Sequence, residues 1–114
     1  VVASRYGTKM QGCTYVALTK LDVLSYMDKI PVCVAYEVDG HRVETFPSGI
    51  EELNNAKPIY EYMPGFQCDI SNCRTVDDLP KEALEYIRYI EKVIECPIKY
   101  VSVGAERDAY ITMF

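Results

Sequence analysis

Two short polar loops contain the residues best suited to bind a ligand. The first is Thr19-Lys20-Leu21-Asp22, and the second is Ser102-Val103-Gly104. Each follows a run of apolar residues rich in Val, Tyr and Ile, which is typical of a buried strand. Ligands of open α/β sheets bind outside the carboxyl ends of the strands. We therefore expect both loops to lie where a ligand would bind.

The Asp22 side chain has the hydrogen-bonding capacity to recognise a guanine base. An ionised carboxylate is an acceptor only, and guanine offers it two neighbouring donors, N1–H and the 2-amino group. Adenine lacks both donors, and sites built around such polar groups reject the wrong partner by about 10⁴ to 10⁵. The stem of Lys20 can lie along the purine face while its ammonium group stays solvated. Backbone N–H groups of Ser102, Val103 and Gly104 would point toward the guanine O6, and Gly104 would permit close approach.

These short matches have a second interpretation, because motifs of this length also occur by chance. Lys20 and Asp22 would then be solvated charges at the end of a strand, and Ser102 to Gly104 an ordinary strand end. Neither loop carries groups for phosphate chemistry, since the six glycines are scattered and the single histidine, His41, lies beside the Asp39-Gly40 turn. We assign no catalytic residue to this sequence.

The spacing of apolar residues indicates strands alternating with helices. We expect helices at 1–10 and 83–94, a helical turn at 51–54, and strands at 13–19, 30–38, 41–46, 98–103 and 110–114. Asp39-Gly40 is typical of a type I′ turn and predicts a β-hairpin. Residues 57–75 contain Pro58, Pro64 and Gly65, which favour an ordered loop. The sequence therefore predicts an α/β fold, with a mixed sheet that includes the hairpin and has flanking helices.

Length and charge limit the classes of protein to consider. The chain has 114 residues, of which 49% are hydrophobic, and these values suit one domain with a modest core. Its net charge of −5 argues against nucleic acid as a partner, because basic residues supply most of that affinity. No apolar run is long enough for a transmembrane helix, so we expect no membrane partner.

The five cysteines predict free thiols. Their number is odd, no C-x-x-C occurs and most lie in apolar runs, so we expect buried, reduced thiols in the cytoplasm. Cys68 and Cys73 have only the distant His41 as a further zinc ligand, which is too few for a structural site. We therefore predict no metal site.

Longer stretches of the sequence resemble one enzyme family. The blocks ALTKLDVL, VCVAYEVDG, PIYEYMPGF, DLP with EYIRYIE, and VSVGAERDAYI are similar to adenylosuccinate synthetases, in the order found in that family. The resemblance extends over essentially all of the chain. It implies that residues 1–114 are the C-terminal, guanine-recognising portion of a larger P-loop-like purine ligase fold. It also implies that six residues hold the guanine of GTP: Lys20, Leu21, Asp22, Ser102, Val103 and Gly104.

The same resemblance implies an activity for the complete protein. It would use GTP to join IMP and L-aspartate, with release of adenylosuccinate, GDP and phosphate, in the cytoplasm and as a homodimer. Its Mg²⁺ ligands and catalytic residues would precede Val1, so this portion alone is expected to be inactive. The alternative is a non-enzymatic guanine-nucleotide binding module. An upstream phosphate loop would distinguish them, because only the ligase requires one.

Overall fold

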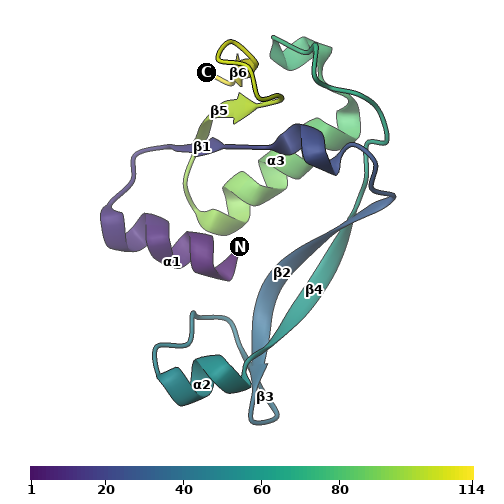
Figure 1. Cartoon of the computed structure of the whole chain (residues 1–114). Coiled ribbons are helices and arrows are strands. Elements are labelled where there is room, and N and C mark those ends of the chain that lie inside the picture. Colours follow the sequence, from purple (N-terminus) through teal and green to yellow (C-terminus); the bar gives the residue numbers. More distant parts are fainter.

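The structure is a computed structural model that describes all of residues 1–114, and it contains two small sheets and three α-helices (Figure 1). The elements in chain order are α1 (Val2–Gln11), β1 (Val16–Leu18), the 3₁₀ helix η1 (Leu21–Leu24), β2 (Lys29–Val38), β3 (His41–Val43), α2 (Ile50–Asn55), β4 (Lys57–Pro64), the 3₁₀ helix η2 (Val76–Asp78), α3 (Lys81–Ile94), β5 (Ile98–Ser102) and β6 (Tyr110–Thr112). No helix is long and apolar enough to cross a membrane.

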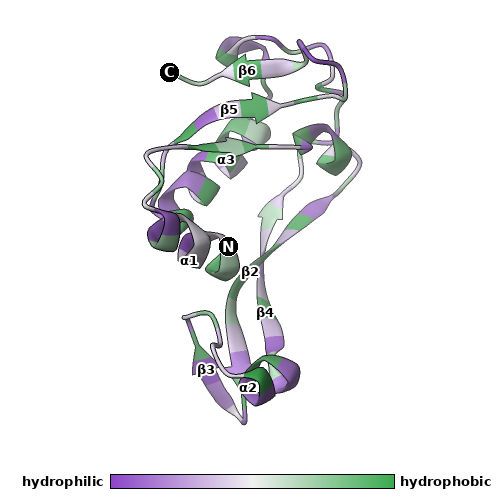
Figure 2. Cartoon of the chain, turned by 60° about the vertical axis from the view of Figure 1, so that its left-hand side comes forward, coloured by the Kyte–Doolittle hydropathy of each residue, from purple (hydrophilic) through white to green (hydrophobic).

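The first sheet has the order β1-β5-β6 and packs on α3. β1 runs parallel to β5, with Val16 opposite Ile98 and Leu18 opposite Val101, and β6 is antiparallel to β5. α3 presents one apolar stripe to the core, formed by Ala83, Ile87, Ile90 and Ile94, all of them buried. This stripe recurs every three or four residues, which is the pattern predicted for 83–94. Figure 2 shows hydrophobic residues in β5 and β6, above α3. The main hydrophobic core lies between this helix and this sheet.

The second sheet has the order β3-β2-β4 and forms a long, twisted arm that projects away from α3 (Figure 1). β2 and β4 are antiparallel, and their pairing shifts at a bulge between Cys33 and Ala35. Asp39 and Gly40 connect β2 to β3 with φ values of 51° and 81°. Two consecutive left-handed residues are the geometry of a type I′ turn, so the predicted hairpin is confirmed.

The loop predicted for residues 57–75 is wrong in its first half, where β4 occupies Lys57–Pro64. Pro58 and Pro64 suggested a loop because proline lacks the N–H that a strand needs. β4, however, is an edge strand paired only with β2. An edge strand leaves alternate N–H groups without a partner, so a proline is tolerated there. The strand at 13–19 shortens to Val16–Leu18, and the strand at 41–46 shortens to His41–Val43.

The cysteines are free, as predicted, but most are not buried. Cys13 and Cys68 are exposed, Cys33 and Cys73 are half-buried, and only Cys96 lies in the core. Burial was expected because most of the cysteines have apolar neighbours in the sequence. Cys13, however, lies in the connection between α1 and β1, and Cys68 lies in the connection after β4.

Gly65 joins the arm to the core at a point of very close backbone contact. A Cβ atom at this position would lie 1.7 Å from the carbonyl oxygen of Met27. The Gly65 N–H donates to the carbonyl oxygen of Asp28, at 2.8 Å. Only glycine leaves room for this approach, so it fixes where β4 leaves the start of β2.

We predict that Gly65→Ala lowers the free energy of unfolding by at least about 3 kcal/mol, because the added methyl group overlaps backbone that cannot move aside. Gly7→Ala is the matched control, since Gly7 lies within α1 and has no atom within 4 Å of an added Cβ. Alanine should stabilise that helix by about 0.5–1 kcal/mol. Urea denaturation measures both effects, and equal stabilities of the two variants would contradict the prediction.

Candidate functional site

The two polar loops lie side by side at one edge of the first sheet. β1 ends at Leu18 and β5 ends at Ser102, and Leu18 pairs with Val101 in a parallel arrangement. Parallel neighbours have their carboxyl ends at the same edge, so the loops that follow them are adjacent. η1, which contains Leu21 and Asp22, is also in contact with β5. The fold thus brings together the two segments that sequence analysis selected.

The first loop is held by a left-handed residue and a buried leucine. Lys20 has φ of 61° and precedes η1, and its carbonyl oxygen accepts the N–H of Val23 at 3.3 Å. The Leu21 side chain is 1% exposed and belongs to the main core. Because Leu21 points inward, Lys20 and Asp22 on either side of it reach the surface.

Asp22 combines a fixed backbone with a carboxylate that has no partner in the chain. Its carbonyl oxygen accepts the N–H of Ser25 at 3.1 Å and the Ser25 hydroxyl at 2.5 Å. Its carboxylate oxygens take part in no hydrogen bond or ion pair, and the Lys20 ammonium group forms no ion pair. A half-buried carboxylate with both oxygens free can accept two donors from a ligand.

The second loop offers fewer free donors than its sequence suggested. Val103 is fully buried, and its N–H donates to the carbonyl oxygen of Ala109 at 2.9 Å. The Ser102 hydroxyl donates to the carbonyl oxygen of Gly104 at 3.1 Å. The N–H of Gly104 has no partner within the chain. Of the three residues, Val103 therefore supports the loop from inside, and the N–H of Gly104 remains available to a ligand.

Two residues that support the loops, Ser25 and Ala109, were not predicted from the sequence. Ser25 fixes the peptide of Asp22, and the signal for it was a serine three residues after an aspartate at a strand end. Ala109 accepts from Val103, and its Cβ would lie 3.1 Å from a Cβ at position 104. A side chain at position 104 would therefore crowd Ala109, a contact within the chain that the sequence did not suggest.

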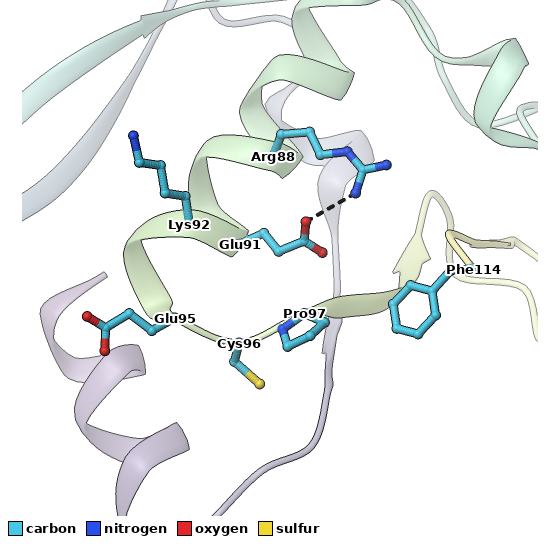
Figure 3. A pocket seen from close by; sticks show the side chains of 7 residues that line it. All are labelled: Arg88, Glu91, Lys92, Glu95, Cys96, Pro97 and Phe114. Carbon is cyan, nitrogen blue, oxygen red and sulfur yellow. Dashed lines mark hydrogen bonds and ion pairs between the residues drawn. The ribbon is translucent and has the colours of Figure 1, made fainter.

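One surface depression lies at the opposite ends of the strands, and some of the side chains that line it are paired with each other (Figure 3). The figure shows Arg88 and Glu91 paired across it, beside Pro97 and Phe114. One oxygen of Glu91 accepts from Arg88 at 3.1 Å, and the other accepts the N–H of Ile98 at 2.7 Å. Glu91 therefore connects α3 to the start of β5, which is a structural role.

No three His, Cys, Asp or Glu side chains come together in a way that could hold a metal ion. A Mg²⁺ ion bound by this chain would need such oxygen ligands. His41 lies exposed at the start of β3, in the arm. The residues present therefore do not form a magnesium site.

The fold defines an α/β unit in which a parallel strand pair is backed by a helix and carries two polar loops at its carboxyl edge. Ligands of open α/β sheets bind at that edge. The sequence profile of the family described as adenylosuccinate synthetase matches residues 1–111. The chain belongs to this family.

Individual relatives agree with this assignment. The chain is 48% identical over 112 residues to the adenylosuccinate synthetase of Synechococcus sp. (strain CC9902) and 46% identical to that of Prochlorococcus marinus (strain MIT 9313). Each match covers 98% of this chain and 26% of the relative, so the chain spans about a quarter of their length. The fully ligated adenylosuccinate synthetase from Plasmodium falciparum has the same fold, with a TM-score of 0.89 and 34% identity over 96% of this chain and 27% of that one. The predicted mixed α/β fold is confirmed.

We predict that Lys20→Gly is more stable than Lys20→Ala by about 1 kcal/mol. Both changes remove the same charge and stem, but a left-handed backbone strains any residue that carries a Cβ. The comparison therefore isolates the conformation at position 20 from the side chain. The free energies of unfolding of the two variants measure it, and a more stable alanine variant would exclude the left-handed conformation.

Proposed function

We propose that this chain recognises the guanine base of GTP in an adenylosuccinate synthetase. The proposal rests on two unpaired groups, the Asp22 carboxylate and the N–H of Gly104, on loops that follow adjacent parallel strands at one sheet edge. A carboxylate acceptor next to a backbone donor complements guanine, which presents N1–H and a 2-amino group next to O6. Adenine reverses this pattern, so it would leave the Asp22 carboxylate without donors.

Each residue of the proposed site has a distinct role. The two Asp22 oxygens accept from guanine N1–H and the 2-amino group, and the N–H of Gly104 donates to O6. Lys20 covers the purine face with its stem, which its exposed position permits. Leu21 and Val103 act through the core, since both side chains are buried, and they hold the loops on either side of the base.

We further propose that the complete protein joins IMP to L-aspartate with hydrolysis of GTP. In that reaction the present residues orient the nucleotide, and phosphoryl transfer depends on groups that this chain does not contain, including the Mg²⁺ ligands. Membership of the adenylosuccinate synthetase family supports this activity. We also propose that the complete protein is a homodimer and is located in the cytoplasm.

We predict that Asp22→Asn in the full-length protein shifts the nucleotide preference from GTP toward XTP. Asparagine offers one acceptor and one donor, which match the N1–H and 2-oxo groups of xanthine and oppose the 2-amino group of guanine. The value of kcat/KM for GTP should fall by about 10²-fold or more, because two hydrogen bonds to a charged group are lost or reversed. Steady-state rates with GTP and XTP as alternative substrates measure the shift.

Asp39→Asn is the matched control, because Asp39 lies at the hairpin turn in the arm and tolerates asparagine at positive φ. Its GTP and XTP kinetics should equal those of the wild type. An Asp22→Asn enzyme with unchanged selectivity would remove Asp22 from the guanine site. Guanine-selective binding by the wild-type full-length protein without any ligase activity would favour a non-enzymatic binding module.

A further inference from the structure

Cys13 and Cys96 occupy equivalent positions after the two longest helices. α1 ends at Gly12, which is left-handed with φ of 62°, and the next N–H, that of Cys13, donates to the carbonyl oxygen of Thr8 at 3.0 Å. α3 ends at Glu95, which is left-handed with φ of 58°. The next N–H, that of Cys96, donates to the carbonyl oxygen of Glu91 at 3.3 Å. Both cysteines thus follow a left-handed helix cap and lead toward a strand of the first sheet.

Packing brings these two equivalent positions together. α1 contacts α3, and β1 pairs with β5, so the two connections run side by side. The Val16 N–H donates to the carbonyl oxygen of Pro97 at 2.8 Å, and Lys9 pairs with Glu95 at 2.6 Å. In the same region, the Cys96 thiol donates a hydrogen bond to the carbonyl oxygen of Cys13, with 3.6 Å from sulfur to oxygen. The two residues are 83 positions apart in the chain, and their contact is therefore a product of the tertiary fold.

The two thiols differ in accessibility. Cys13 is exposed, whereas Cys96 is 5% exposed and belongs to the core cluster. Figure 3 shows the Cys96 sulfur turned away from the Arg88–Glu91 pair. Burial raises the pKa of the Cys96 thiol, and the negative charge of a nearby Cys13 thiolate raises it further. An oxidant would therefore meet Cys13 first, and Cys96 is the thiol placed to react with the product.

We propose that Cys13 and Cys96 form a reversible intramolecular disulfide when the protein meets a small-molecule disulfide such as oxidised glutathione. The Cys13 thiolate attacks one sulfur of the oxidant, which releases one glutathione thiol and leaves a mixed disulfide on Cys13. The Cys96 thiolate then attacks the Cys13 sulfur, which forms the protein disulfide and expels the second glutathione. The two protein thiols are oxidised, the glutathione disulfide is reduced, and the two protons end on the two glutathione thiols.

The proposed bond would join the connections that precede β1 and β5. The loops of the proposed guanine site lie at the other ends of the same strands, so the cross-link leaves them open. Closing a loop that spans most of the chain restricts the unfolded state strongly, so the oxidised protein should be the more stable form. The proposal stands independently of the guanine site, because it rests on the contact between the Cys96 thiol and the backbone carbonyl of Cys13.

The test uses the full-length protein, held under native conditions with oxidised glutathione as the oxidant. Free thiols are then alkylated, and the digested protein is mapped by mass spectrometry. We expect a peptide pair joined through Cys13 and Cys96 that dithiothreitol separates. Oxidation should raise the Tm of the wild type by several degrees, and dithiothreitol should reverse the rise.

Two exposed cysteines provide matched variants. Cys13→Ser should abolish the cross-linked peptide and the rise in Tm on oxidation, while Cys68→Ser should retain both. Serine is tolerated at these positions because both side chains are exposed in the native chain. Three outcomes would overturn the proposal: a stable glutathione adduct on Cys13 with Cys96 still reduced, a cross-link from Cys13 to another cysteine, or an unchanged Tm despite complete cross-linking.

Discussion

The parallel pairing of β1 with β5 is the contact on which the other features depend. It is short, with Val16 to Leu18 on one strand and Ile98 to Val101 on the other. Parallel strands must be connected by a long crossover, and here the crossover contains the whole arm and α3. Because the strands are parallel, the two polar loops lie at one end of the pair. The C-terminal ends of α1 and α3 lie at the other end. α3 stabilises the strand pair by burying four side chains in the core beside the sheet.

The arm depends on the same core through a few contacts at its base. The Tyr89 hydroxyl on α3 donates to Glu61 on β4 at 2.8 Å, and Gln67 donates to Asp28 at 2.7 Å. Burial and the acceptor Glu61 both raise the pKa of Tyr89, so the phenol stays protonated and remains a donor at neutral pH. These exposed hydrogen bonds contribute modestly, and the close backbone contact at Gly65 sets the direction of the arm.

Patterns that repeat over many residues could be predicted from the sequence, and features set by distant neighbours could not. The apolar stripe of α3 and the Asp39-Gly40 turn are local, and both elements form where the sequence indicates. β4 was missed because its prolines are acceptable only on an edge strand, and edge position depends on the whole sheet. At the candidate site, the two loops selected from the sequence follow adjacent parallel strands. It could not reveal that Ala109 takes up the N–H of Val103, because that bond depends on how the chain turns back after Gly104.

The burial of Leu21 has a further consequence for the evolution of this protein. Leu21 lies between Lys20 and Asp22 in the first loop and shares a core cluster with Ile98 and Val101. A substitution that changes the packing of this cluster therefore shifts the backbone of Lys20 and Asp22. With the proposed guanine site on these two residues, mutations deep in the interior would change nucleotide preference and thermal stability together, so the two properties should vary together among descendants of this sequence.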